Sequence, residues 1–373
     1  MKNKVYLDYN ATSPIRPSVI EAVTTAMSVV GNPSSVHAAG RSAKATIEEA
    51  RSKVAALVGS RPRDVMFCGG GTEANNTVIN GAGASSLIVS GIEHDSVLAA
   101  AKVAGIPVYT VQTNVDGIVD LGQLEALLKE APEPALVSVM MANNEMGVIQ
   151  PVHKIRNLTK SYNARFHTDA IQAAGKINID MPSLGADYLT LSSHKIGGPQ
   201  GLGVVILAPT APLKPLVVGG GQELGRRSGT ENVAGIAGFG VAAYEALVGL
   251  AGAKAMSDMR DDLEQRIRAI SNEAVIVGEG AKRLPNTSCI AMPGVKGETQ
   301  VMHFDLAGIC LSSGSACSSG KVKVSHVLSS MGYTDELAES SIRVSLGYDS
   351  KPSDVDAFVA AWKALYERVS KKA

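Results

Sequence analysis

Short apolar runs alternate with helix-like segments between about residue 60 and residue 210. Most runs are separated by about 20 to 30 residues, which is room for the crossover helix that parallel strands require. The alternation therefore predicts an α/β domain with a mainly parallel, doubly wound, seven-stranded sheet that helices cover on both faces. The runs rich in β-branched residues are 65–68, 87–90, 108–111, 136–141, 164–168, 188–192 and 204–207.

Helical periodicity continues on both sides of this region. Residues 41–59 carry apolar positions at helical spacing and end at Gly59, which suits the end of a helix. The run 235–253 is rich in Gly and Ala and has one charge, Glu245, so we expect a long buried helix rather than a membrane span. Residues 15–260 are predicted to form the large domain. Residues 1–14 and 261–373 are predicted to form a smaller α+β domain, with a strand near 288–292 and a helix near 354–371.

Charge and cysteine content exclude several classes of function. The 373 residues include 35 basic and 35 acidic side chains, so the formal net charge is zero. We therefore expect neither a nucleic-acid partner nor an anionic membrane. The four cysteines form no C-x-x-C pair, so neither a zinc site nor a disulfide framework is indicated. The first residues lack an apolar signal core, and a cytoplasmic location with reduced thiols is expected.

The first candidate site is the run 69–72, Gly-Gly-Gly-Thr, which follows an apolar strand and begins a helix. Glycines let an anion approach the backbone, and a helix start offers unpaired N–H groups, so the run is a candidate phosphate site. An ordinary glycine turn explains it equally well. The same segment, with Ala74 and with Glu93 about 20 residues later, matches a loose dinucleotide fingerprint. A nicotinamide-dependent oxidoreductase is therefore an open alternative.

Two further strand ends carry reactive side chains. Asp169 and Gln172 follow the run 164–168, and a carboxylate there that meets a ring nitrogen would keep that nitrogen protonated. A helix N-cap is the simpler role for Asp169. Lys195 follows the run 188–192 within Ser-Ser-His-Lys-Ile-Gly-Gly, where a desolvated amine can form a Schiff base. A surface lysine at the end of a strand is the alternative.

Taken together, these sites resemble a pyridoxal phosphate enzyme with the aminotransferase fold, of the class V branch. Further segments resemble the cysteine desulfurases of that branch, in the group typified by NifS and IscS. The resemblance extends from about Tyr6 to Leu346. Its motifs are Tyr6-Leu-Asp-Tyr-Asn-Ala-Thr, Asn32-Pro-Ser-Ser-x-His37, Asn143-Asn-Glu-x-Gly147, Gly219-Gly-Gly-Gln-Glu223, Arg227-Ser-Gly-Thr-Glu-Asn232 and Ser312-Ser-Gly-Ser-Ala-Cys317.

The resemblance implies pyridoxal 5′-phosphate as the cofactor and assigns residues to each part of it. Lys195 would bind it covalently, Asp169 would contact the ring nitrogen, and Gln172 would contact the ring hydroxyl. The phosphate would be bound by four residues of the same chain, Gly71, Thr72, Ser192 and His194. Thr230 would reach the phosphate in the neighbouring subunit, which implies a homodimer.

The resemblance also implies the residues that handle the substrate, L-cysteine. His94 would stack over the cofactor ring and carry protons, and Asn144 would lie near both cofactor and substrate. Arg343 would bind the substrate carboxylate, for which a guanidinium offers two parallel donors. Taken alone, His94 and Arg343 would be ordinary surface residues.

Cys317 is the predicted nucleophile. It lies among Ser, Gly and Ala without apolar periodicity, so we expect an exposed, mobile loop, and the nearby Lys321 and Lys323 favour a thiolate. The other three cysteines lie in apolar runs, which suits small buried residues.

The resemblance implies a reaction for Cys317. It would take sulfur from L-cysteine as a persulfide, release L-alanine, and pass sulfur to an iron–sulfur scaffold or another acceptor. It implies no resident metal, and leaves room for Cys317 as a transient ligand of a cluster shared with a scaffold. Open alternatives are a relative acting on selenocysteine or cysteine sulfinate, a plain aminotransferase, which needs no thiol, and an inactive sulfur-carrier partner.

Overall fold

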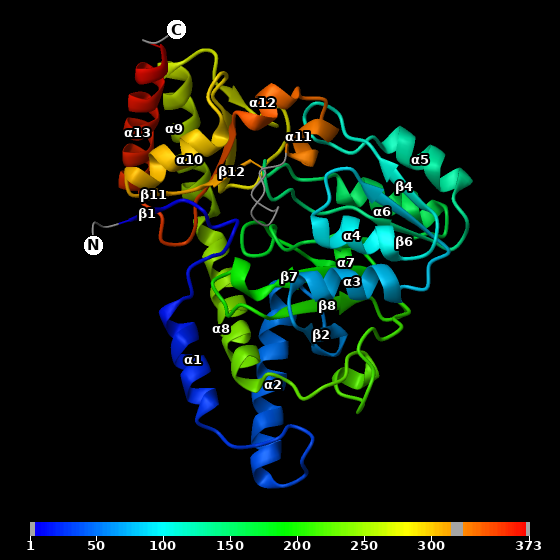
Figure 1. Ribbon diagram of the computed structural model, residues 1–373. Coiled ribbons are helices and arrows are strands. Elements are labelled where there is room, and N and C mark those ends of the chain that lie inside the picture. The colour runs from blue at the N-terminus through cyan, green and yellow to red at the C-terminus, as the bar shows by residue number, and fades with distance from the viewer. Residues whose placement is uncertain (1–3, 315–323, 371–373) are drawn as a thin grey trace.

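A computed structural model describes residues 4–314 and 324–370 (Figure 1). Its central feature is a seven-stranded sheet, in which β8 is antiparallel to both of its neighbours and the other neighbouring pairs are parallel. From one edge to the other, the strands are β2 (Val65–Cys68), β8 (Gly203–Leu207), β7 (Tyr188–Ser192), β6 (Arg165–Asp169), β5 (Ala135–Ser138), β3 (Ser86–Ser90) and β4 (Val108–Val111). The predicted α/β fold with its mainly parallel sheet is confirmed.

Two strand predictions differ from the structure by more than a shift of one residue at an end. β5 ends at Ser138, three residues before the predicted end, because the backbone N–H of Met140 donates to the Glu93 carboxylate. A sheet that helices cover on both faces predicts buried strands, but β4 lies at the edge of the sheet and Val108 is 40% exposed.

Helices cover both faces of the sheet, each with its own apolar core. On one face, α3 (Gly71–Gly81) and α4 (Asp95–Val103) pack against side chains such as Met66 and Leu87. On the other face lie α2 (Ala38–Leu57), α5 (Leu121–Glu130), α6 (Val152–Ser161), α7 (Met181–Leu184) and α8 (Val233–Gly249). The predicted helix 41–59 begins earlier, at Ala38, because the His37 side chain caps it by accepting from the Gly40 N–H.

The predicted apolar helix is α8. It crosses the molecule beside α2 and α1 (Pro17–Met27), and it continues through a short 3-10 turn into α9 (Ala253–Ile270) (Figure 1). By length and composition alone, the stretch Val233–Ile270 could span a membrane. In the structure, 44% of the most apolar 18-residue part of this stretch is buried. The buried residues of α8, such as Ile236, Phe239 and Ala243, lie on one face, so the expected burial holds for that face of the helix. Gly240 shows why small residues are needed on that face, since a Cβ there would lie 2.7 Å from the Ala50 side chain.

A second, smaller core surrounds a four-stranded antiparallel sheet in the order β12-β13-β10-β9. Its strands are β12 (Ser312–Ser313), β13 (Ser341–Ser345), β10 (Thr287–Ala291) and β9 (Val275–Ile276). Helices α9, α10 (Gly297–Leu306) and α13 (Pro352–Ser370) cover it, and Phe304 stacks on Phe358. Two short helices, α11 (His326–Ser330) and α12 (Asp335–Glu339), precede β13.

The N-terminal residues lie with this smaller sheet. Strand β1 (Val5–Tyr6) pairs in parallel with β11 (Ile309–Cys310), and Leu7 is buried in the smaller core. The chain then crosses to the large sheet, where the backbone N–H of Ser13 donates to the His194 carbonyl. The domain limits at residues 14 and 260 stay predictions. This crossing brings residues 8–12 to the carboxyl ends of the large-sheet strands.

Candidate active site

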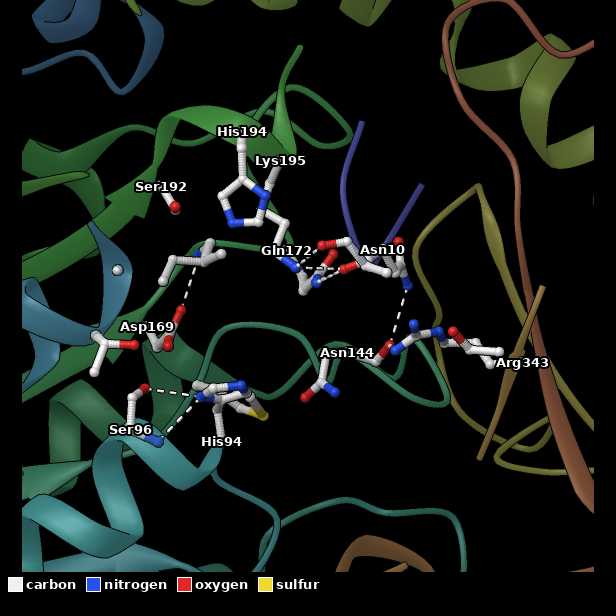
Figure 2. Close-up of a pocket in the computed structure, with 16 residues that line it drawn as sticks. Asn10, His94, Ser96, Asn144, Asp169, Gln172, Ser192, His194, Lys195 and Arg343 are labelled. Carbon is white, nitrogen blue, oxygen red and sulfur yellow. Dashed lines mark hydrogen bonds between the residues drawn. The ribbon is translucent and has the colours of Figure 1, made fainter. Parts of the chain in front are cut away.

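A cavity of about 330 Å³ lies between the carboxyl ends of the large-sheet strands and the smaller sheet (Figure 2). Ligands bind at this edge in open α/β sheets, because loops from several strands converge there. Ten of the twelve predicted site residues line the cavity: Gly71, Thr72, His94, Asn144, Asp169, Gln172, Ser192, His194, Lys195 and Arg343. The structure therefore brings together residues that are up to 272 positions apart in the sequence (343 − 71 = 272).

The glycine run forms one wall of the cavity. Gly70 precedes α3 with φ 143°, a conformation that side chains disfavour, so glycine is needed to turn from β2 into the helix. Gly71 and Thr72, in the first turn of the eleven-residue helix α3, line the cavity together with Ser192, and the first N–H groups of a helix have no partner within it. This wall thus offers uncharged donors and the positive end of a helix dipole, which suits a phosphate.

Asp169 ends β6 and is buried, with 4% of its surface exposed. Its carboxylate accepts from the Asn75 amide at 2.8 Å and from the Ile171 N–H at 2.9 Å. Burial raises the pKa of Asp169, while these hydrogen bonds and the charges of His94 and Lys195 act against that rise. The residues after Asp169 form turns and not a helix, so the N-cap role is wrong. A buried carboxylate that lines a cavity is best stabilised by a cationic ligand atom.

Lys195 lies at the end of β7, in a short 3-10 turn (Ser193–Lys195), and its side chain enters the cavity. The Nζ atom donates to the carbonyls of Asn10 at 2.5 Å and Ala11 at 2.8 Å. The neighbouring His194 has its pKa lowered to about 4, by burial and by the charge of Lys195. His194 is therefore neutral at pH 7, and its Nδ1 lies 3.1 Å from the Thr12 hydroxyl.

His94 caps α4 and also lines the cavity (Figure 2). Its Nδ1 accepts from the Ser96 N–H at 3.0 Å, so in the neutral ring the proton resides on Nε2. Burial lowers the pKa of His94, and the positive charge of Lys195 lowers it further. A neutral ring at pH 7, fixed in one tautomer by the backbone, is suited to exchange a proton at Nε2.

Arg343, in β13, is the cation that the smaller sheet contributes. It is 2% exposed, donates to Asp8 Oδ1 at 3.0 Å and to the Asn144 carbonyl at 3.1 Å, and its Nε has no hydrogen-bond partner among the described residues. Asp8 also accepts from the Ser312 hydroxyl at 2.8 Å. Because Asp8 balances its charge, the guanidinium is held rigidly and keeps donor capacity for an anionic ligand.

The structure argues against the dinucleotide alternative at Glu93. This side chain is fully buried, and its Oε1 accepts from the Ser90 hydroxyl at 2.5 Å and from the Met140 N–H at 2.7 Å. A ribose-binding carboxylate must face a ligand, whereas Glu93 supports the wall behind His94. Burial raises the pKa of Glu93 to about 8.

We expect the Glu93→Gln variant to gain stability over the unmodified protein as the pH rises. The folded protein keeps Glu93 protonated up to about pH 8, whereas an unfolded chain releases this proton near pH 4.3. Stability is therefore lost as pH rises between these values, by at most about 1.4 kcal/mol per pH unit, and glutamine cannot ionise. Urea-unfolding midpoints at pH 5, 6.5 and 8 measure the difference. Glu21→Gln, on the exposed face of α1, is the control, and a difference between variant and parent that does not change with pH contradicts the prediction.

Two predicted residues are not placed in the cavity. Thr230 is exposed and lines a separate pocket with Cys68 and Arg227. Cys317 lies outside the described residues. Of the other cysteines, Cys68 and Cys289 are buried, which raises the pKa of each thiol to about 12, whereas Cys310 is half-buried rather than buried as expected. Within 4–314 and 324–370, no group of three or more His, Cys, Asp or Glu residues is placed to hold a metal ion.

Several residues that build the cavity are not among the predicted site residues. Asn10 and Ser312 line it, and Asp8 holds Arg343 from behind. Asp8 and Asn10 lie in the motif 6–12, and Ser312 begins the motif 312–317. The signal was therefore present, although nothing in the residue types alone gave these side chains a role.

The donor set of the cavity fits pyridoxal 5′-phosphate. The glycine wall offers neutral donors for a phosphate, Lys195 offers an amine for an aldehyde, and the buried carboxylate of Asp169 offers a partner for a protonated ring nitrogen. Each group comes from a different strand end, and the cavity lies between them.

Fold and cavity together define a class of protein. A family model described as "Aminotransferase class-V" matches residues 5–358, and the chain belongs to that family, whose members are pyridoxal phosphate enzymes. The cysteine desulfurase IscS of Dictyoglomus turgidum is 36% identical over 380 residues, covering 99% of this chain and 96% of the relative. Within the family, the chain belongs to the NifS/IscS-type cysteine desulfurases.

Solved structures agree with this assignment. The X-ray structure of a NifS-like protein from Rickettsia africae is 38% identical, has a TM-score of 0.91, and covers 98% of this chain and 100% of its own. The structure of SspA in complex with cysteine is 30% identical, with a TM-score of 0.79, and covers 92% of this chain and 99% of its own.

Proposed function

We propose that this chain removes sulfur from L-cysteine to give L-alanine and a persulfide on Cys317. The observation that carries the proposal is that Lys195, Asp169 and Arg343 line one cavity, so that an amine, a buried carboxylate and a guanidinium converge on one small ligand space. The solved relative in complex with cysteine supports this substrate. Relatives with this activity align over nearly the whole chain.

Four parts of the chain would hold the cofactor. Lys195 would bind it covalently through Nζ, and the wall around Gly71 and Thr72 would bind the phosphate. Asp169 would keep the ring nitrogen protonated, and Gln172 would donate to the ring hydroxyl. Bound in this way, pyridoxal phosphate supplies an electron sink for the carbanion that forms at the substrate Cα.

The side chains of the cavity would orient the substrate and move its protons. Arg343, held by Asp8, binds the substrate carboxylate and so places the Cα near Lys195. Lys195 Nζ takes the Cα proton, and His94 Nε2 exchanges a second proton on the other side of the cavity. His94 can do so because the Ser96 N–H already occupies its Nδ1.

Sulfur transfer needs a thiolate, and Cys317 is the cysteine of the family motif. Its Sγ attacks the substrate sulfur, a new S–S bond forms, and the Cβ–S bond breaks with its electron pair left on the substrate carbon. Protonation of that carbon completes L-alanine, and the persulfide sulfur passes to an acceptor thiol, such as that of an iron–sulfur scaffold. A cytoplasmic location, where thiols stay reduced, suits this chemistry.

A homodimer is part of the proposal. Thr230 is exposed and outside the cavity of its own chain, as a residue serving a neighbouring subunit must be. The segment before it exposes Leu216, Val218 and Leu224, which are 50%, 77% and 76% exposed. Apolar surface of this kind is stabilised by a partner that covers it.

Alanine and sulfide should form in equal amounts, over many turnovers, when the purified protein is incubated with L-cysteine and a thiol reductant. The amounts should be equal because each molecule of L-cysteine yields one molecule of alanine and one of sulfide. Both products are measured in the same samples. Protein that carries lysine-bound pyridoxal phosphate yet forms neither product contradicts the proposed substrate and leaves the cofactor assignment intact.

A further inference from the structure

Lys176 lies four residues after Gln172, and no step proposed above uses it. Its Nζ donates to Gln172 Oε1 at 2.8 Å and to Asn10 Oδ1 at 3.2 Å. The half-buried side chain also borders a second cavity of about 400 Å³, which Lys195 lines as well. A lysine that lies between the two cavities and bonds to two residues of the first is more than a solvated surface charge.

The contacts of Lys176 determine how the Gln172 amide is oriented. An ammonium group can only donate, so the amide atom that faces it must be Oε1. The Nε2 atom then points the other way, where it donates to the Asn10 carbonyl at 3.0 Å (Figure 2). A flipped amide would place its NH₂ group against the ammonium and lose the bond. Lys176 thus turns the donor side of Gln172 away from itself.

Asn10 is held by the same lysine. Its Oδ1 accepts from Lys176 and from Asn286 at 3.0 Å, and its Nδ2 donates to the Asn144 carbonyl at 3.1 Å. The backbone carbonyl of Asn10 accepts from both Gln172 and Lys195. Lys176 therefore acts on the position of Lys195 through one intervening residue.

We propose that Lys176 is a positioning residue, which fixes the Gln172 amide as a donor to the hydroxyl edge of the bound cofactor and adds positive potential beside Lys195. The proposal rests on the proposed cofactor site. It concerns a residue that touches neither cofactor nor substrate and acts through Gln172 and Asn10.

The charges around Lys176 set the pH range over which it adds positive potential. Burial, and the charges of Lys195 and Arg343, lower the pKa of Lys176 to about 7, so its positive charge is complete well below pH 7 and declines above it, whereas its N–H groups can donate to Gln172 and Asn10 in either form. The other ionisable side chains that line the second cavity are Tyr9, Arg16, Lys195 and Tyr348, and no carboxylate lines that cavity among the described residues. Positive potential next to Lys195 disfavours the protonated form of the Lys195–cofactor linkage and so lowers its pKa. A hydrogen-bond donor at the ring hydroxyl stabilises the deprotonated oxygen of that hydroxyl, and this also lowers the pKa of the linkage.

Lys176→Met removes the charge and both hydrogen bonds while keeping a side chain of similar length. We expect the pH midpoint at which the Lys195–cofactor linkage loses its proton to rise by about one unit. The midpoint is read from the visible absorption of the cofactor in the holoenzyme, without substrate. An unchanged midpoint overturns the proposal. Because the readout needs only bound cofactor, it stays valid if the protein proves inactive on L-cysteine.

A double-mutant comparison separates positioning from a general structural effect. In a Gln172→Met background, Lys176→Met should shift the midpoint by clearly less than it does alone, since the two residues act as a unit. Equal shifts in both backgrounds overturn action through Gln172. Lys176→Arg, which keeps charge and donors, should retain most of the original midpoint, and Lys160→Met, on the exposed end of α6, should leave it unchanged. If the methionine variant does not retain cofactor, Lys176→Gln takes its place, and its midpoint must also rise.

Discussion

Cys317→Ala should abolish sulfide release from L-cysteine while the protein still binds pyridoxal phosphate. The reason is chemical, since alanine has no nucleophile to receive the substrate sulfur and the cofactor site is built from other segments. The expected loss is at least about a thousandfold, comparable to removing the nucleophile of other covalent enzymes. Sulfide is measured over many turnovers, and the cofactor is measured by its absorption.

Cys310→Ala is the matched control for this prediction. Cys310 lies seven residues earlier, is half-buried and belongs to β11. We expect this variant to keep most of its sulfide release, because Cys310 does not line the cavity. Normal turnover in Cys317→Ala, or an equal loss in both variants, contradicts the role proposed for Cys317.

Lys195→Ala should lose the covalent bond to the cofactor and, with it, turnover of L-cysteine. The amine is needed twice, first to hold the cofactor and then to take the Cα proton, and a positioned acid–base group alone contributes about 10² to 10⁴ in rate. Borohydride reduction followed by mass analysis of the protein shows whether cofactor is attached. The unmodified chain should gain the mass of one reduced cofactor, and the variant should gain none.

A lysine that is remote from the cavity provides the control here. Lys154→Ala, at an exposed position in α6, should keep both the reducible bond and the activity. A cofactor that remains reducibly attached to protein in Lys195→Ala would place the bond on another amine and refute the assignment of Lys195.

The strands of the large sheet, and the reactive residues at their ends, were readable from the sequence. Asp169 is the last residue of β6, Lys195 lies three residues after the end of β7, and the carboxyl ends of parallel strands meet at one edge of a sheet. Their convergence is therefore a consequence of local pattern and sheet geometry. The limits of β5 were less predictable, because the Met140 N–H bonds to the Glu93 side chain and not to a neighbouring strand.

The second half of the cavity could not be derived from local pattern. Asp8 and Arg343 are 335 residues apart and meet only because the N-terminal segment lies against β13. Their motifs pointed to the family, but residue type and spacing carry no information about such a contact. Lys176 was missed for the same reason, since its partner Asn10 comes from that segment.

The sequence by itself determined the fold class, the family and the reactive residues at the end of each strand, because periodicity and strand-end chemistry are local properties of the chain. Only the tertiary structure decided how those residues are held. It placed Asp8 behind Arg343, turned the Gln172 amide toward Lys176 and kept Glu93 inside the wall behind His94. Hydrogen-bond direction, burial and charge balance arise between segments that are distant in the chain, so they exist only once both parts of the protein have packed around the cavity.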